Sequence, residues 1–397
     1  MPFAKDPIYL DHNATTPILP EVLEAMLPYL GEHFGNPSSG HVYGRRAREV
    51  VEASRARVAA LIGASPEEIV LTSGGTESNN LAIRGVAAAR SQRRHVVTSA
   101  IEHPATDAPC RLLERQGWEV TVLGVDASGR IRVDEATRAV RETTALVTVI
   151  HASNETGVLQ PVTELAGAVR AAGALIHTDA AQSAGKVPVD VDVLGVDLLS
   201  IAGHKLYAPK GVGALYVRRG TPIVPVLLGA EQEHALRPGT ENVASIVGLG
   251  AACETAARTL EEEAKRVSVL RDALWRQLRA GIPGILINGR ERERLPNTLN
   301  VRLPGARGQA VLDACPEVAA STGSACHAGT EAPSKVLTAM GLGEEEALGA
   351  LRLSLGRGTT AEAVDRAAAV LIAAWRRVTQ QGRGRPPMPR AAGDRSR

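Results

Sequence analysis

Residues 68–89 read EIVLTSGGTESNNLAIRGVAAA, a short apolar run followed by two glycines and a helical pattern. The run 68–72 has the length and composition of a buried strand, and the stretch 77–89 has the apolar spacing of a helix. Paired glycines let backbone approach an anion, and the free N–H groups at a helix start favour a phosphate. The segment lacks the lysine of a nucleoside-triphosphate loop. It therefore predicts either a site for another phosphate group or a glycine cap without a ligand.

The same alternation of strand and helix continues as far as residue 217. Further strands are expected at His95–Ser99, Glu119–Leu123, Ala145–His151, Ala174–Thr178, Asp197–Ala202 and Gly213–Val217. Helical patterns lie between most of them, at Gly44–Ile62, Glu77–Ala89, Ala105–Arg115 and Val162–Ala172. This alternation is typical of an α/β fold with a mostly parallel central sheet that is covered by helices on both faces.

The pattern changes after Glu241 and indicates a second, smaller α+β domain. A long helical region is followed by short strands and a last helix, over Asn242–Ala280, Gly284–Ile287, Thr298–Leu303, Leu351–Leu355 and Ala361–Thr379. We expect a large domain over residues 15–255 and a small domain formed by residues 1–14 and 256–380. Residues 381–397 combine five arginines with proline and glycine, which predicts a disordered tail.

Composition narrows the class of protein. The 397 residues hold 45 Lys and Arg against 43 Asp and Glu, which argues against a chain built to coat nucleic acid or a membrane. No run of about 18 uncharged apolar residues predicts a membrane span, and the first ten residues do not resemble a secretory signal. Four cysteines without a CxxC pair predict neither a disulfide scaffold nor zinc. We expect a cytoplasmic protein without a metal site, whose basic tail binds nucleic acid weakly at most.

Polar side chains follow five of the predicted strands at their carboxyl ends, where open α/β sheets bind ligands. These side chains are Thr76, His103, Asn154, Asp179, Gln182, His204 and Lys205. Pyridoxal 5'-phosphate needs a lysine for its Schiff base, an acid beside its ring nitrogen and an anion site for its phosphate. Asp179 suits the ring nitrogen, Thr76 suits the phosphate, and His103 can stack on the ring.

Lysine is rare in this chain, with only six among the 45 basic residues. Unlike arginine, lysine readily becomes a neutral amine nucleophile. The lysines in the N-terminal arm, in turns or on helices are Lys5, Lys186, Lys210, Lys265 and Lys335. Lys205 alone follows a buried strand in the same predicted sheet as Asp179. It is therefore the candidate for the cofactor lysine, and a structural lysine in a salt bridge is the alternative.

Ten segments, in order from residue 10 to about 360, resemble the cysteine desulfurases of the NifS and IscS type, within the class-V aminotransferases. They are LDHNATTP (10–17), FGNPSS (34–39), TSGGTESN (72–79), EHP (102–104), NETG (154–157), HTDAAQ (177–182), GHK (203–205), RPGTEN (237–242), STGSAC (321–326) and RLSLGR (352–357). The resemblance covers essentially the whole folded chain. It implies a pyridoxal-phosphate-dependent transferase of fold type I.

The resemblance also implies a role for each matched residue. The residues implied to bind the cofactor are Gly75, Thr76, His103, Asn154, Asp179, Gln182, His204, Lys205 and Thr240. Among these, Gln182 is implied to bind the phenolic oxygen, and Thr240 is implied to reach the phosphate across a homodimer interface. Asn154 and Arg352 are implied to clamp the substrate carboxylate, a task that suits the arginine fork. The catalytic residues are implied to be Lys205, His103 and Cys326.

One position departs from the family pattern. Members of the family usually carry a serine or threonine three residues before the lysine, in contact with the phosphate, where this chain has Ala202. Ser200 lies on the same strand face but about 6–7 Å further back, given the rise of a strand. We expect one fewer hydrogen bond to the phosphate, at a cost of about 1–2 kcal/mol in cofactor binding.

The activity implied by the resemblance is conversion of L-cysteine to L-alanine with a persulfide on Cys326. A protein acceptor would take the sulfur for iron–sulfur assembly, tRNA thiolation or DNA sulfur modification. His327 beside the cysteine resembles selenocysteine lyases, which would share every site residue. Another class-V aminotransferase that uses an α-keto acid, and a non-enzymatic scaffold that uses the basic tail, are the remaining alternatives.

Overall fold

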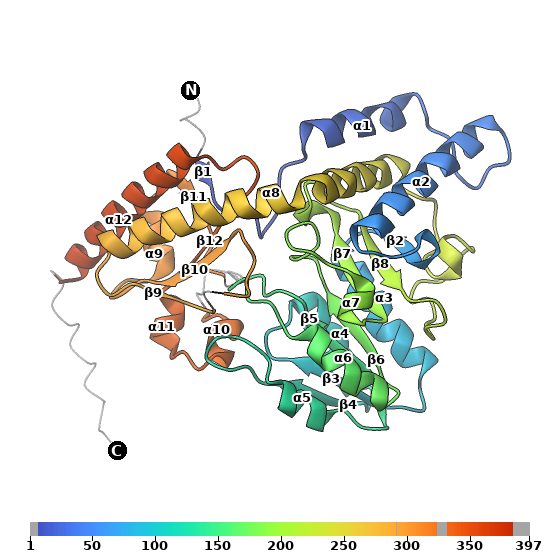
Figure 1. The fold of residues 1–397 in the computed structure, drawn as a ribbon, viewed down its shortest axis with the longest axis horizontal. Helices are drawn as coiled ribbons and strands as arrows, with labels where there is room; N and C mark the ends of the chain where they lie inside the picture. The colour runs from blue at the N-terminus through green and yellow to red at the C-terminus, as the bar shows by residue number, and fades with distance from the viewer. Residues whose placement is uncertain (1–6, 291, 324–331, 384–397) are drawn as a thin grey trace, which may run out of the picture.

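A seven-stranded sheet lies at the centre of the fold. The computed structural model describes residues 7–290, 292–323 and 332–383 (Figure 1). The strands are β2 (Ile69–Thr72), β3 (His95–Ser99), β4 (Glu119–Leu123), β5 (Thr144–Ile150), β6 (Leu175–Asp179), β7 (Leu198–Ala202) and β8 (Gly213–Val217). Their order is β2-β8-β7-β6-β5-β3-β4. Only β8 runs antiparallel to its neighbours, β2 and β7. The predicted α/β fold with a mostly parallel sheet is confirmed.

Helices cover both faces of this sheet because its strands are apolar on both sides. The helices of this part are α1 (Pro20–Gly31), α2 (Val42–Leu61), α3 (Gly75–Ala89), α4 (Pro104–Arg115), α5 (Val133–Ala139), α6 (Val162–Ala171) and α7 (Val191–Leu194). Residues of α3 and α4 pack on one face together with Val70 and Leu198. Residues of α2 and α6 pack on the other face with Leu71 and Leu199, as the alternation of side chains along a strand requires.

A second group of elements follows the long helix α8 (Val243–Gly281), at the left of Figure 1. It contains an antiparallel sheet of β9 (Leu286–Ile287), β10 (Thr298–Arg302) and β12 (Ala350–Ser354). The N-terminal strand β1 (Ile8–Tyr9) pairs with β11 (Val318–Ala319). The remaining helices are α9 (Gly308–Asp313), α10 (Lys335–Ala339), α11 (Glu344–Leu348) and α12 (Ala361–Arg383).

The buried residues of α8 divide between two hydrophobic clusters. Its residues up to Ala256 belong to the cluster on the central sheet, and those from Val267 belong to a separate cluster with β10, β12 and α12. This distribution supports a boundary inside α8. The division into residues 15–255 and residues 1–14 with 256–380 stays a prediction.

Most element ends lie within one or two residues of the predicted positions, and α12 is the clearest exception. It continues to Arg383, three residues into the segment 381–397 that was expected to be disordered. Glutamine is a good helix former, so Gln380 and Gln381 extend the helix. Residues 384–397 lie outside the described residues. Among the helices that the structure describes, none is both long enough and apolar enough to cross a membrane.

Candidate active site

The candidate site lies at the carboxyl ends of the central strands. Strand β6 ends on Asp179, and β7 runs directly into a 3-10 turn, Gly203–Lys205, that carries His204 and Lys205. Helix α3 begins at Gly75, three residues after the end of β2, and α4 begins directly after His103. Because parallel strands end at the same edge, residues from distant parts of the chain meet there.

Lys205 is held as a largely buried amine. Its Nζ donates to the carbonyl oxygens of Asn13 and Ala14, at 2.6 Å each. Burial and the nearby charge of Arg352 together lower the pKa of Lys205 to about 8, against the opposing effect of Asp11 and Asp179. A lowered pKa makes a neutral amine available near neutral pH. That property suits a Schiff-base lysine.

Asp179 is buried and held by two hydrogen bonds. Its Oδ2 accepts from Asn79 Nδ2 at 2.7 Å, and its Oδ1 accepts from the backbone N–H of Ala181 at 2.9 Å. Asn79, on α3, also donates to Thr106 at 3.1 Å, and its own Oδ1 is buried without a hydrogen-bond partner. The carboxylate is thus fixed in place at the floor of the site, as a partner for a ring nitrogen must be.

His103 caps α4. Its Nδ1 accepts from the backbone N–H of Ala105 at 3.1 Å, and burial lowers its pKa, opposed by Asp179 and assisted by Lys205. Beside it, Glu102 is half-buried, and its Oε1 accepts from Ser99 and from the backbone N–H of Ile150. Burial raises the pKa of Glu102 to about 8. This carboxyl is therefore protonated, a feature that the sequence did not reveal.

The start of α3 offers the predicted phosphate cradle. Gly74, which precedes the helix, has φ of 144°, in the region that favours glycine. A Cβ on Gly75 would lie 3.3 Å from Ala202 Cβ and 3.9 Å from Ala181 Cβ, so these side chains flank the first turn. Thr76 follows it and is exposed. His204 lies across the edge with its Nδ1 3.2 Å from Thr15 Oγ1, and burial lowers its pKa to about 4.

Ser200 does not reach this cradle. Its Oγ lies 3.0 Å from His177 Nε2, and both residues are fully buried within the sheet. The side chain that does face Gly75 is the methyl group of Ala202. The expectation that Ser200 is a poor substitute agrees with this geometry.

Gln182 lies between two lysines. Its Nε2 donates to the carbonyl oxygen of Asn13 at 2.9 Å, and its Oε1 accepts from Lys186 Nζ at 2.9 Å. Lys186 lies in a turn, as expected, but its amino group is buried, and burial lowers its pKa to about 7. The turn explained its backbone and not its side chain, so sequence reasoning missed this residue.

Arg352 and Asn154 lie together, as the resemblance implied. Arg352, on β12, donates from Nη1 to the carbonyl oxygen of Asn154 at 3.1 Å and from Nη2 to Asp11 Oδ1 at 2.7 Å. Its Nε is buried without a partner. Asn13 joins the two parts of the chain, because its Nδ2 donates to the Asn154 carbonyl at 3.2 Å and to Thr298 Oγ1 at 2.9 Å. Asp11 and Asn13 were not predicted as site residues.

Cys326 and His327 lie outside the described residues, so their roles stay predictions. The described chain on either side of them reaches this site. Ser321 pairs with Arg352 through its backbone, and Ser334 donates its hydroxyl to Glu155 Oε2. Burial raises the pKa of Glu155 to about 7.

The segment that carries Thr240 is anchored to the central sheet. Glu233, in a stretch where three successive residues have positive φ, forms a buried ion pair with Arg55 at 2.6 Å and accepts from the backbone N–H of Leu71. Arg237 Nε donates to Glu77 Oε1 at 3.0 Å, which ties the segment to the start of α3. Thr240 itself is exposed in this single chain.

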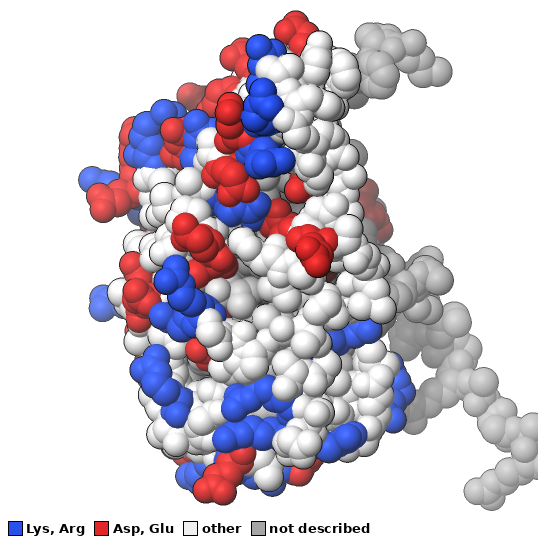
Figure 2. Space-filling view, turned by 90° about the vertical axis from the view of Figure 1, so that its right-hand side faces the viewer, with Lys and Arg blue, Asp and Glu red and all other residues white. Residues whose placement is uncertain are grey.

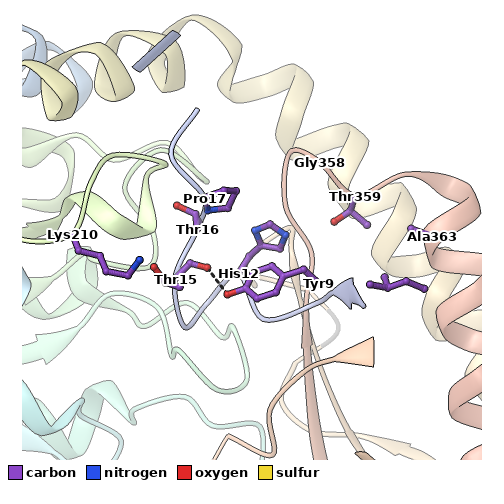
Figure 3. Close-up of a pocket in the computed structure, with 10 residues that line it drawn as sticks. Tyr9, His12, Thr15, Thr16, Pro17, Lys210, Gly358, Thr359 and Ala363 are labelled. Atoms are coloured by element: carbon purple, nitrogen blue, oxygen red, sulfur yellow. Dashed lines mark hydrogen bonds between the residues drawn. The ribbon is translucent and has the colours of Figure 1, made fainter. Parts of the chain in front are cut away.

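A cavity of about 600 Å³ lies beside the N-terminal arm, between the arm, Lys210 and the start of α12 (Figure 3). Tyr9, His12, Thr15 and Thr16 line it from the arm, and Lys210 and the start of α12 complete it. The Tyr9 hydroxyl donates to the Thr15 carbonyl across this space at 2.9 Å. None of the described residues with an implied cofactor or substrate role lines this cavity.

The residues of the site fit pyridoxal 5'-phosphate. A buried amine, a fixed carboxylate and a glycine-containing helix start meet at one edge, and an arginine Nε and an asparagine oxygen are buried there without partners. Unpartnered buried polar atoms indicate a missing partner, since native proteins rarely leave such groups unpaired.

Comparison with known proteins agrees with this fit. The family model described as aminotransferase class-V matches residues 8–367. The chain therefore belongs to the class-V aminotransferase family, and pyridoxal 5'-phosphate is its cofactor. The resemblance seen in the sequence is confirmed.

A relative from Dictyoglomus turgidum, cysteine desulfurase IscS, is 46% identical over 90% of this chain and 92% of its own length. A NifS-like protein structure superposes with a TM-score of 0.87 at 36% identity, covering 92% of this chain and 98% of that one. The structure of SspA in complex with cysteine has a TM-score of 0.79 at 38% identity, covering 87% and 98%.

Proposed function

We propose that the chain is a cysteine desulfurase that converts L-cysteine to L-alanine and holds the sulfur as a persulfide on Cys326. The names of the similar proteins support this activity. The observation that carries the proposal is Lys205, a buried amine at the edge of the sheet. Arg352 lies close enough to Lys205 to help lower its pKa to about 8. An amine with a carboxylate-binding group nearby suits a small amino acid substrate.

Each step of the reaction is assigned to a residue of this chain. Bound pyridoxal phosphate withdraws electrons from the α-carbon of an amino acid. Arg352, with Asn154, binds the substrate carboxylate, because an arginine fork matches two carboxylate oxygens. Lys205 Nζ takes the proton from the α-carbon, and His103, whose pKa is lowered, is the second group able to carry a proton.

Cys326 is proposed to take the sulfur. Its thiolate attacks the substrate sulfur, so an S–S bond forms as the C–S bond breaks. The electron pair of the broken bond stays with the carbon, where a proton completes alanine. The persulfide is then passed to an acceptor protein.

Two variants test the assignment. Lys205→Ala should lose the visible absorbance of the lysine-bound cofactor. Cys326→Ser should keep that absorbance but release no sulfide and form no persulfide from cysteine. Cys253→Ala, a buried cysteine of α8, is the matched control and should behave as the unmodified chain. Sulfide release at the unmodified rate by Cys326→Ser would refute the role of Cys326.

The same preparation distinguishes the alternatives. Alanine formed from cysteine without an α-keto acid excludes an aminotransferase. Turnover of selenocysteine with little turnover of cysteine would identify a selenocysteine lyase instead. Retained cofactor without turnover of either amino acid would favour a scaffold.

We further propose that the chain forms a homodimer in which Thr240 of one protomer reaches the cofactor phosphate of the other. Figure 2 shows a broad face with few charged side chains, and the elements on that side of Figure 1 carry exposed apolar residues. They include Leu27, Leu30, Phe34, Tyr43, Leu227 and Leu228. Exposed apolar patches of this kind are typical of interfaces.

The dimer has a direct test. Leu228, which is 89% exposed, is changed to aspartate, and Leu286 on β9, which is 51% exposed, gives the matched control Leu286→Asp. We expect Leu228→Asp to shift the mass measured by sedimentation toward the monomer and to weaken cofactor binding. A monomeric unmodified chain with bound cofactor would contradict the proposal.

The cell compartment and the acceptor complete the proposal. The protein is proposed to act in the cytoplasm, where thiols stay reduced and a persulfide acceptor can be reached. Capture of proteins that take labelled sulfur from Cys326, with Cys326→Ser as control, would identify the acceptor.

A further inference from the structure

A second buried lysine is linked to the cofactor lysine through two hydrogen-bonded groups. Lys186 Nζ donates to Gln182 Oε1 at 2.9 Å, and Gln182 Nε2 donates to the Asn13 carbonyl at 2.9 Å. The same carbonyl oxygen accepts from Lys205 Nζ at 2.6 Å. The two amines are thus joined through one amide and one carbonyl group.

Both neighbours of the Gln182 amide favour the same orientation. The Asn13 carbonyl can only accept a hydrogen bond, so the amide nitrogen must face it. The amino group of Lys186 donates on the other side, so the amide oxygen must face Lys186. A rotated amide would bring two oxygens together at Asn13 and two N–H groups together at Lys186. Lys186 therefore reinforces the amide orientation that the Asn13 carbonyl also favours.

The setting of Lys186 is not that of an ordinary structural lysine. Buried lysines are normally paired with a carboxylate, and no ion pair of Lys186 occurs in the part of the chain that the structure describes. The charges that act on it, Lys205 and Arg352, are both positive. Glu263, which lines a small cavity beside it, is already paired with Arg266. The imidazoles of His12 and His204 feel its charge as well. The fold thus keeps a costly amine at this point.

We propose that Lys186 is a positioning residue that fixes the Gln182 amide, so that its nitrogen points toward Lys205 and the phenolic oxygen of the cofactor. The inference rests on the proposed function only through the cofactor and its implied contact with Gln182. It does not depend on cysteine as the substrate.

The test reads the cofactor rather than turnover. In the holoenzyme, the visible absorbance of the lysine-bound cofactor is titrated with pH for the unmodified chain and for Lys186→Met. A donor on the phenolic oxygen favours its charged form, and its loss raises the pH of the colour change. We expect a rise of roughly half to one pH unit. The small cavity of about 40 Å³ beside Lys186 leaves room for the methionine side chain.

A double-variant cycle separates positioning from a simple effect of charge. Gln182→Leu removes the amide, and the double variant Lys186→Met with Gln182→Leu should titrate like Gln182→Leu alone. Lys335→Met, an exposed lysine on α10, is the matched control and should leave the titration unchanged. Lys186→Gln serves in place of Lys186→Met if the latter fails to fold or to retain cofactor.

Two outcomes would overturn the proposal. An unchanged titration of both Lys186 variants, with cofactor bound, would show that the amide needs no support. Shifts that add fully in the double variant would mean that Lys186 acts through its charge alone. Failure of cysteine turnover affects neither reading, so it bears on the proposed function only.

Discussion

Ala202→Ser tests how this chain holds the cofactor phosphate. Ala202 ends β7, is 3% exposed, and its Cβ lies 3.3 Å from the position that a Cβ on Gly75 would take. A hydroxyl on this methyl group would therefore lie at the first turn of α3, beside its free N–H groups. One added hydrogen bond to a charged phosphate is worth about 1–2 kcal/mol. The dissociation constant of the cofactor should thus fall roughly 5- to 30-fold.

The assay is an equilibrium titration of the apoenzyme with pyridoxal 5'-phosphate, followed by visible absorbance. Ser200→Ala is the matched control, because the Ser200 hydroxyl contacts His177 rather than the cradle. It should lower the free energy of unfolding by about 1–3 kcal/mol, through loss of a buried hydrogen bond, and leave cofactor affinity unchanged. The reasoning is refuted if Ala202→Ser folds normally and binds no more tightly, or if Ser200→Ala alone weakens binding.

Three further changes have defined outcomes. Burial raises the pKa of Glu102 from 4.5 to about 8, so the folded state keeps a proton that the unfolded state releases in this pH range. The free energy of unfolding should therefore fall between these two pH values by about 1.4 kcal/mol per pH unit. Urea unfolding of Glu102→Gln should lack this fall. Glu233→Ala leaves the buried Arg55 with the exposed Glu52 as its ion-pair partner and leaves the Leu71 N–H without its acceptor. It should lower the free energy of unfolding by about 3 kcal/mol in the same assay. Arg352→Lys keeps the charge without the fork and should raise KM for cysteine about tenfold or more, with a smaller effect on kcat. A fall in kcat of about tenfold with KM unchanged would contradict the carboxylate clamp.

The sequence predicts well what depends on local pattern. The strand His95–Ser99 has the predicted bounds, because a run of β-branched residues between turn signals leaves little choice. Asp179 and Lys205 were predicted because the carboxyl ends of parallel strands lie at the same edge of the sheet, so residues that follow them meet there. The cofactor was predicted by the same rule, since its binding residues collect where the strands end, whereas the activity was implied by the family resemblance.

Residues whose role depends on long-range contacts were not found. Asn13 belongs to an arm with no periodic pattern, and its partners Asn154 and Thr298 lie far along the chain. Lys186 was assigned to its turn, because the turn signal describes the backbone and is silent about the direction of the side chain. The antiparallel direction of β8 was also not predicted. The pattern of a strand does not show its direction, and only the short connection after Lys205 indicates it.

The N-terminal arm has a consequence for synthesis of the protein in the cell. Asn13 is made long before Ser354, yet its backbone N–H donates to the Ser354 hydroxyl, 341 residues later. The central sheet is complete once β8, ending at Val217, has been made. A nascent chain stalled before residue 354 would thus have the sheet and Lys205 but would lack the Ser354 hydroxyl that accepts from the Asn13 N–H. Such contacts close very long loops and form late. The complete set of contacts that hold the arm beside Lys205 therefore forms only after residue 354 has been made.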